Sequence, residues 1–477
     1  MYRKLMLTVL VLGLAVASPI AMAEEGTSKW HVFADAQARW DRLENYFDFD
    51  SNGSPQDAFS FTPYRVLVGV DGELANNVSV RIAVQNSGYW GNQTPFLSGA
   101  SVYAPNFQHL DGDFVSQSGS ESNTMLYNGS ITLHKMFGSK INATVGRQET
   151  EFGNGLIIGN EPFYNGNVFD GVNAGWDDDG WALHGFFFKT SETNPAVSAA
   201  HDDHTIDGLY YTNKLGDGKW GDLDVYAVGF QDGFEGFGVG APHFWTFGGL
   251  WRQMVNSKAD AEKHNWDWSL EVATQSGDVN DEFDLDGDGK TSDELNLGGT
   301  IIEGWLGYNL VHGNMVHRFS AGVYSASGDD DATDGNLDGW VNLYPTVHGR
   351  LGNSDFFSIL NQGSSYVIGF GPSGFGPGVT AWNLGYRANV NDKHYFGVKY
   401  WNFQPTEDSI KTGSSSKVSV GDFGNEFDFW YKYAYSENVW FFANASVLSP
   451  DDGLTGGNGA PDDSVTRFYA GIKLMVD

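Results

Sequence analysis

The sequence has no cysteine in 477 residues, which excludes disulfide bonds and thiolate metal sites. Proline is scarce at 14 residues, whereas glycine reaches 62 and aromatic residues make up 15% of the chain, a composition that favours strands and turns. Basic residues are few as well. Because 27 Lys and Arg stand against 60 Asp and Glu, the net charge of −33 argues against nucleic acid as a partner.

Long apolar runs are also missing. After the first 23 residues no run of about 18 apolar residues occurs, so no transmembrane helix is expected. The start of the chain has the form of a secretory signal, with an apolar stretch over 5–17 and the small residues of Ala21-Met22-Ala23. We expect residues 1–23 to be a cleaved signal peptide. Residues 24–477 contain no Pro-rich or Ser-rich linker and should form one unit.

Alternation of apolar and polar residues dominates this unit. In residues 425–447, Phe427 and Phe429 alternate with Glu426 and Asp428, and a period of two gives a strand one apolar face. Eighteen such segments occur, each of about ten residues or slightly more, the length of a tilted membrane-spanning strand. They lie at 29–44, 58–74, 78–91, 123–138, 141–153, 168–178, 181–191, 204–214, 220–234, 243–256, 264–277, 297–310, 315–328, 378–390, 393–405, 424–435, 439–449 and 464–477.

The connections between these segments alternate between short and long. Short ones such as 75–77 and 391–392 alternate with long ones such as 92–122 and 329–377. This arrangement is typical of a transmembrane β-barrel. The sequence therefore predicts an all-β protein, an antiparallel barrel of about 18 strands in the outer membrane of a Gram-negative bacterium, with short periplasmic turns and long extracellular loops. A soluble β-propeller is the competing interpretation, but no repeat of 40–50 residues is evident.

The polar parity of each strand should line the barrel interior, because an Arg facing lipid at mid-depth costs about 2–4 kcal/mol. The alternation does not show whether Arg147 faces the interior or the lipid. For Arg252 it indicates the interior only weakly. Two interpretations stay open: neutralising ion pairs that stiffen the wall, or a basic ladder that binds carboxylates of a passing solute. The candidate pore-lining residues on the strands are Arg39, Arg65, Arg81, Arg147, Arg252, Glu303, Arg318, Arg387, Lys399, Lys432 and Arg467.

Two stretches carry a family resemblance. Residues 146–172 contain "GRQ" and, further on, "FDGV", and residues 342–357 read "NLYPTVHGRLGNSDFF". They resemble the alginate-export family of outer-membrane proteins, which implies an 18-stranded barrel whose electropositive constriction passes an anionic exopolysaccharide. The resemblance implies that Arg147 and Asp170 are lumen or rim residues. It also implies that the stretch with His348, Arg350 and Asp355 folds inward near the pore, which adds Arg350 to the candidate set.

Two acidic or His-containing stretches could bind metal. In "DLDGDGKTSDE", the residues Asp284, Asp286 and Asp288 followed by Gly289 resemble the start of an EF-hand calcium loop. Asp293 or Glu294 would have to replace the missing last ligand. A solvated acidic loop is the alternative. The "HDDH" at 201–204 is expected to be a plain polar loop. Catalytic fingerprints such as HExxH or a P-loop are missing, so we expect a protein that is not an enzyme and has no cofactor apart from this structural calcium.

We therefore expect a passive channel for anionic solutes, with export of a uronate-rich polysaccharide as the leading possibility. The alternatives are a general small-solute porin and a barrel that sheathes a periplasmic redox or secretion partner. The expected partners are outer-membrane lipid and lipopolysaccharide, an anionic polysaccharide or small anions, and periplasmic export or redox proteins.

Overall fold

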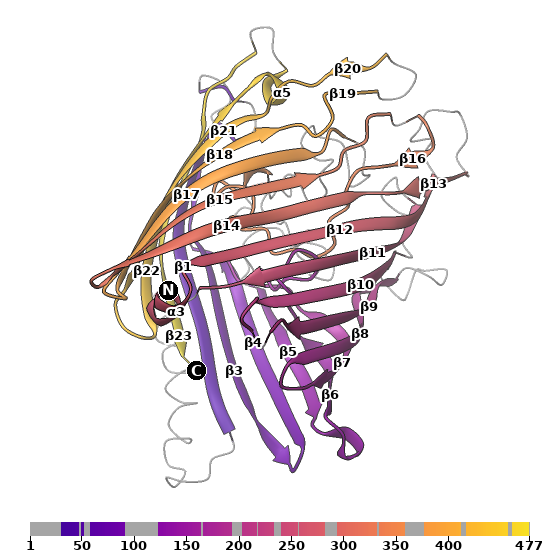
Figure 1. Cartoon of the computed structure of the whole chain (residues 1–477), viewed down its shortest axis with the longest axis vertical. Coiled ribbons are helices and arrows are strands. Elements are labelled where there is room, and N and C mark those ends of the chain that lie inside the picture. Colours follow the sequence, from indigo (N-terminus) through magenta and orange to yellow (C-terminus); the bar gives the residue numbers. More distant parts are fainter. Residues whose placement is uncertain are drawn as a thin grey trace.

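The computed structural model describes residues 30–46, 49–51, 58–90, 123–163, 166–192, 203–216, 218–232, 240–255, 257–281, 293–331, 333–357, 376–411, 416–456 and 460–476. Within these ranges, eighteen long strands form a closed antiparallel barrel (Figure 1). Closure is made by β1 and β23, which pair from Ala34 opposite Val476 to Glu44 opposite Thr466. Every strand of a closed barrel has two neighbours, so the backbone N–H and C=O groups are satisfied without water.

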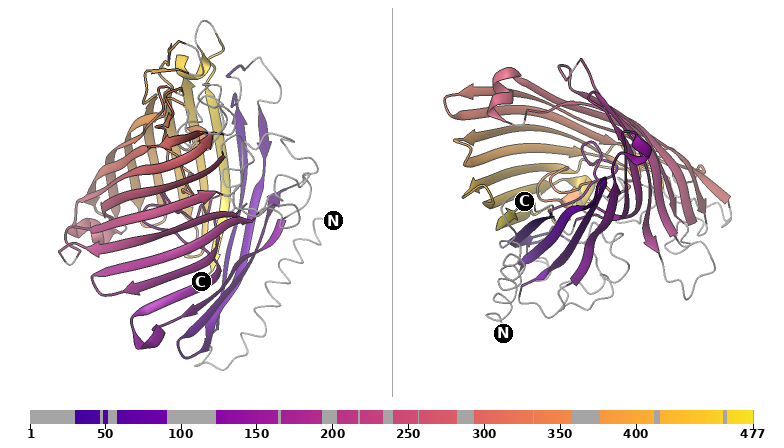
Figure 2. Two further views of the ribbon diagram at one scale, coloured as in Figure 1. Left: turned by 90° about the vertical axis from the view of Figure 1, so that its right-hand side faces the viewer. Right: turned by 90° about the horizontal axis from the view of Figure 1, so that it is seen from below.

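The barrel strands follow one another around the wall in chain order (Figures 1 and 2). They are β1 (Trp30–Glu44), β3 (Pro63–Ala75), β4 (Val78–Tyr89), β5 (Asn123–Leu133), β6 (Ile141–Gln148), β7 (Phe169–Asp177), β8 (Trp181–Glu192), β9 (Asp203–Lys214), β10 (Asp222–Asp232), β11 (Gly240–Gln253), β12 (Trp266–Asp281), β14 (Thr300–His312), β15 (Met315–Ala326), β17 (Val379–Val390), β18 (His394–Gln404), β21 (Gly424–Ala434), β22 (Val439–Pro450) and β23 (Val465–Val476).

Short elements decorate the connections. They are β2 (Phe59–Phe61), β13 (Asp293–Leu297), β16 (Asn336–Leu337), β19 (Ser409–Ile410), β20 (Val418–Ser419), η2 (Met136–Gly138), α3 (Lys258–Lys263) and α5 (Asp452–Thr455). No helix in the described ranges is long and apolar enough to cross a membrane. The predicted leader, residues 1–23, lies outside the described residues.

The eighteen predicted segments correspond one to one with the barrel strands, and the alternation has the predicted meaning. On β21, Phe427 is 63% and Phe429 49% exposed, while Glu426 and Asp428 on the other face are buried. The apolar parity faces outward, where lipid replaces water. Strand ends differ: the segment predicted at 141–153 is a strand only to Gln148, because the chain then leaves the wall and turns inward.

The hydrophobic core lies inside the barrel rather than between two sheets. Inward side chains such as Phe169, Phe188 and Phe244 are fully buried against Trp340 and Tyr344 from the connection between β15 and β17. The interior toward the long-loop end is therefore filled by the chain's own connections, of which only the one between β15 and β17 was predicted to fold inward. These inward-folded connections form one side of the candidate functional site.

Two long connections are joined at the long-loop end of the barrel. Lys411 forms ion pairs with Asp331 at 3.0 Å, and Lys417 forms one with Asp330. Next to them Asp329 is only 5% exposed, and its Oδ2 has no hydrogen-bond partner among the described residues. Burial, together with the nearby acids Asp334 and Asp338, raises the pKa of Asp329 to about 7.

Lipid exposure predicts a depth-dependent cost for a new charge. Leu384, 55% exposed at the middle of β17, should lose about 2–4 kcal/mol of unfolding free energy on Leu384→Arg. Leu74 is equally exposed but lies beside the short β3–β4 turn, so Leu74→Arg should lose only about 0–1 kcal/mol. Urea unfolding of the barrel in lipid vesicles measures both; equal losses would contradict the outward assignment.

The pKa of Asp329 predicts a pH-sensitive outer loop. Because the folded value of about 7 lies above the unfolded value of about 3.9, the folded loop binds the proton more tightly, and its stability falls as pH rises from about 4 to 7. Amide hydrogen exchange over residues 333–338, corrected for intrinsic rates, should be faster at pH 8 than at pH 5. In Asp329→Asn this difference should disappear, with peptides from β17 as the unchanged reference.

Candidate functional site

Two segments of the chain lie within the barrel and contact each other. The first inner segment comprises residues 149–163 and 166–168 between β6 and β7, and the second comprises residues 338–357 between β16 and β17. Tyr344 donates its backbone N–H to the carbonyl of Ile157 at 3.0 Å, and Glu161 Oε2 accepts the backbone N–H groups of Val347 and His348. Burial raises the pKa of Glu161. The two segments thus form one unit.

Backbone carbonyls of the first inner segment fasten it to two walls. Arg39 of β1 donates to the carbonyl of Phe163 at 2.7 Å and covers its ring at 3.8 Å. On the far side, Arg252 of β11 donates to the carbonyl of Gly153 at 2.5 Å and to Asn154 Oδ1 at 3.0 Å. These arginines therefore face inward as predicted, but they hold the chain's own backbone.

The second inner segment is fastened by a buried ion-pair network. Arg467 of β23 contacts Asp41 of β1 at 2.8 Å and Asp355 of the segment at 2.7 Å, and all three side chains are fully buried. His348 Nδ1 lies 2.6 Å from the same Asp355 carboxylate. A cation bridging two carboxylates compensates charge that would otherwise be costly to bury.

Residues just before Asp355 reach two further strands of the wall. Arg350 pairs with Glu303 of β14 and donates to the carbonyl of Asn154 in the first inner segment. Ser354 donates its backbone N–H to Glu426 of β21 at 2.9 Å. Gly352 permits this approach: its φ is +85°, and a Cβ there would lie 2.5 Å from a Glu426 oxygen. The stretch predicted to fold inward does so.

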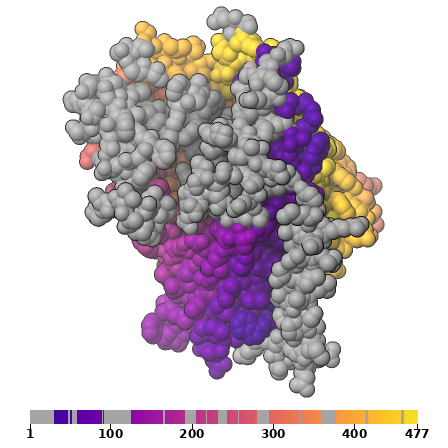
Figure 3. Space-filling view, turned by 180° about the vertical axis from the view of Figure 1, so that it is seen from behind, coloured from indigo at the N-terminus to yellow at the C-terminus, as the bar shows by residue number. Residues whose placement is uncertain are grey.

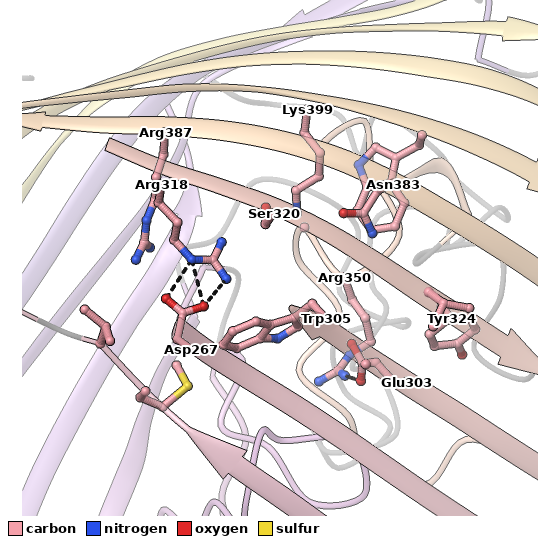
Figure 4. A pocket seen from close by; sticks show the side chains of 16 residues that line it. Asp267, Glu303, Trp305, Arg318, Ser320, Tyr324, Arg350, Asn383, Arg387 and Lys399 are labelled. Atoms are coloured by element: carbon pink, nitrogen blue, oxygen red, sulfur yellow. Dashed lines mark hydrogen bonds and ion pairs between the residues drawn. The ribbon is translucent and has the colours of Figure 1, made fainter. Parts of the chain in front are cut away.

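A cavity of about 300 Å³ remains between the second inner segment and the inner wall of β12 to β18 (Figure 4). Its charged lining consists of the cations Arg318, Arg350, Arg387 and Lys399 and the anions Asp267 and Glu303, which gives 4 − 2 = +2. Trp305, Trp401, Asn383 and Ser320 add aromatic faces and polar groups.

The positive charge in the cavity comes mainly from Arg387 and Lys399. Arg318 is held by Asp267 through three contacts of 2.6 to 3.0 Å, and Arg350 is held by Glu303. Arg387 and Lys399 form no ion pair with a described carboxylate. Arg387 lies directly opposite Arg318 in register, and Figure 4 shows both directed toward the same opening. Two cations are thus available to a solute.

Two further acids near the cavity, Asp224 of β10 and Glu271 of β12, are each held by a tyrosine. Tyr210 donates to Asp224 at 2.7 Å and Tyr226 donates to Glu271 at 2.9 Å, and the two tyrosine rings stack. Phe152 of the first inner segment covers Tyr210 at 4.6 Å between ring centroids. These carboxylates are buried beneath the inner segment and do not line the cavity.

Three other candidates lie away from the cavity. Arg65 is buried beside Asp35 and Gln85, and Arg81 pairs with Asp71 near the short-turn end. Lys432 lies over the Trp440 ring at 4.5 Å and forms no ion pair with a described carboxylate.

The prediction that Arg147 lines the pore is wrong. Arg147 has the same parity as Val145, which is 47% exposed, and pairs with Asp170 on the outer face, so it does not line the pore. Asp170 is therefore a rim residue.

Alternation missed the aromatic and amide groups of the cavity. A signal existed, since Trp305 is two residues from Glu303 and Trp401 two from Lys399, on the same inward parity. The predicted calcium ligands Asp284, Asp286 and Asp288 lie outside the described residues, and Glu294 lies on β13. Among the described residues no group of three or more His, Asp or Glu is placed to hold a metal ion.

Buried Arg467 predicts a large energetic effect. Arg467→Gln leaves Asp41 and Asp355 uncompensated and should lower the unfolding free energy by about 3–5 kcal/mol. Arg42→Gln is the matched control, because the Arg42–Glu44 pair is half exposed and should contribute about 0–1 kcal/mol. Urea titration in vesicles with Trp fluorescence distinguishes them; similar shifts would show that the network contributes little.

Comparison with known proteins identifies a family and a set of similar structures. Residues 65–369, which include both inner segments, match the family model described as alginate export. Comparison with curated protein sequences found no match.

Several solved porins share the fold. A BenF-like porin from Pseudomonas fluorescens Pf-5 is 11% identical, covers 94% of this chain and 99% of its own, and has a TM-score of 0.53. Pseudomonas aeruginosa OpdK with vanillate is 11% identical at a TM-score of 0.54, covering 93% and 98%. Pseudomonas aeruginosa OccK2 in complex with glucuronate is 11% identical at 0.52, covering 94% and 98%.

Proposed function

The chain belongs to the alginate export family and forms an outer-membrane channel of porin type, and we propose that it passively conducts anionic solutes by binding their carboxylate in the cavity. The observation that carries this proposal is the pair Arg387 and Lys399, which face a net-positive cavity with no ion pair to a described carboxylate. The planar guanidinium of Arg387 can hold a carboxylate through two hydrogen bonds, while Lys399 supplies a point charge.

The lining suits a carboxylate attached to a ring. Trp305 offers an aromatic face, and Asn383, Ser320 and Glu303 offer hydrogen-bonding groups for hydroxyls. About 300 Å³ accommodates one such ring. Vanillate and glucuronate, bound by two of the similar porins, are both ring-bearing carboxylates, which supports the same solute class here.

Export of a uronate-rich polysaccharide is the second candidate, and the family match favours it. A polymer would need more room than one ring, and the inner segments are pinned to opposite walls through Arg350 and Arg467. Polymer passage would therefore require this unit to shift. A sheath for a partner protein is less favoured, because the inner segments occupy the space such a partner would need.

Ion selectivity tests the proposal. In planar bilayers under a KCl gradient the wild-type channel should prefer chloride, and Arg387→Gln/Lys399→Gln should lower the chloride-to-potassium permeability ratio about fivefold for each cation, as expected for ~1 kcal/mol at 4 Å in water. Lys140→Gln, in the short β5–β6 turn, is the control and should leave the ratio unchanged. A cation-selective wild type would reject anion conduction.

Solute block separates the two candidates. Glucuronate should interrupt the wild-type current and should lose this effect in the double variant. A hexameric oligouronate that blocks far more strongly than the monomer would favour polymer export, whereas equal or weaker block would favour small solutes.

A further inference from the structure

Four aromatic side chains on β18, β21 and β22 face the lumen and lie outside the cavity. They form the inner aromatic patch, which comprises Tyr395, Trp430, Trp440 and Phe442. Each is half-buried, while Phe429 and Phe441, of the opposite parity, are 49% and 44% exposed toward lipid. The alternation that places Lys399 and Asp428 inside therefore places these four rings inside as well.

The inner aromatic patch extends from the level of Arg387 to the short-turn end of the barrel. In register, Arg387 is followed across β18 by Gly397 and then by Trp430, so Trp430 lies two strands away, about 10 Å. Tyr395 lies opposite Lys432 in the next inward row, closer to the short β17–β18 turn. Figure 3 shows the barrel from outside, with the short turns that join β3 to β4 and β5 to β6 at its lower end.

Glycines of the neighbouring strands let two of these rings lie against the wall. A Cβ on Gly397 would be 2.5 to 2.6 Å from three atoms of the Trp430 ring, and a Cβ on Gly471 would be 2.7 Å from the Phe442 ring. A ring that covers a glycine keeps close to the backbone and turns its second face toward the lumen. Such a face can pack against the apolar surface of another ring.

A lysine lies between two rings of the patch. Lys432 Nζ is 4.5 Å from the centroid of the Trp440 ring and 5.7 Å from that of the Tyr395 ring. It forms no ion pair with a described carboxylate, whereas Lys473 of β23 pairs with Asp35 at 3.2 Å. The rings hold the ammonium group in place without neutralising its charge, so this charge is available to an anion.

We propose that the inner aromatic patch and Lys432 form a second binding site, on the short-turn side of the cavity, for a ring-bearing carboxylate. The apolar face of the solute ring stacks on Trp430 or Trp440, and Lys432 pairs with the carboxylate. A solute released from Arg387 then meets another site about 10 Å away, and several weak sites in series favour conduction. The solute class rests on the proposed function, but the site does not depend on Arg387 and Lys399 as the residues that bind it.

Current block by glucuronate and gluconate tests the site in the full barrel in planar bilayers. Both anions have six carbons and one negative charge, but only glucuronate has a ring. Trp430→Leu/Trp440→Leu should weaken block by glucuronate about fivefold and leave block by gluconate unchanged, because only the ring contact is lost. Trp266→Leu is the matched control, since Trp266 lies at the short-turn end of β12 and is 51% exposed toward lipid. Glucuronate block at the wild-type level in the double variant would overturn the proposal.

A milder variant, Lys432→Gln, keeps all four rings. It should weaken block by both anions about fivefold, because it removes a charge that both contact. Unchanged block by glucuronate would overturn the pairing of the carboxylate with Lys432.

Comparison with Arg387→Gln/Lys399→Gln separates this proposal from the proposed function. If that variant keeps the wild-type block and the tryptophan variant loses it, the cavity assignment fails and the second site stands. The reverse result would overturn the second site and leave the cavity. A wild-type channel that glucuronate does not block would overturn both.

Discussion

Contact with hydrocarbon is the constraint on which this structure depends. A charge facing lipid at mid-depth costs about 2–4 kcal/mol, so the strands place their apolar parity outside and their charges inside. Leu384, Leu306 and Phe429 face out, while Asp267, Glu426 and Arg467 face in and are buried. Exposed apolar side chains are then the expected surface of a barrel, and the interior becomes a crowded region in which every charge needs compensation.

The inner segments supply much of that compensation. Asp355 joins Asp41 in neutralising Arg467, Ser354 donates to Glu426, and backbone carbonyls of Gly153 and Phe163 accept from arginines of the wall. Because these contacts attach one folded unit to strands on opposite sides, the unit is pinned. Arg387 and Lys399 are the cavity cations that form no ion pair with a described carboxylate, and in the proposed function they bind the anionic solute.

The sequence predicted the barrel well because each membrane-spanning strand carries its own alternation of apolar and polar residues. A period of two, repeated eighteen times and separated by alternating short and long connections, identified the strands and the inward parity of Arg318, Arg387 and Lys399. It could not show which inward charges are consumed by the inner segments. Arg39 and Arg252 are held by backbone carbonyls, which leave no trace in a side-chain pattern.

The site prediction failed where a residue's environment depends on contacts outside its own strand. Arg147 was grouped with the pore on the strength of its motif, although Val145, two residues earlier, shares its parity and faces lipid. The buried state of Arg467 follows from an inward turn of residues more than a hundred positions away. Contacts of this range depend on where long connections go, and alternation within a strand carries no information about that.

The most direct test of the central claim is an experimental structure of the barrel with bound glucuronate. We expect the carboxylate to lie within hydrogen-bond distance of Arg387 and Lys399, with the sugar ring against Trp305. A carboxylate bound elsewhere in the lumen, with Arg387 and Lys399 contacting only protein groups, would contradict the account.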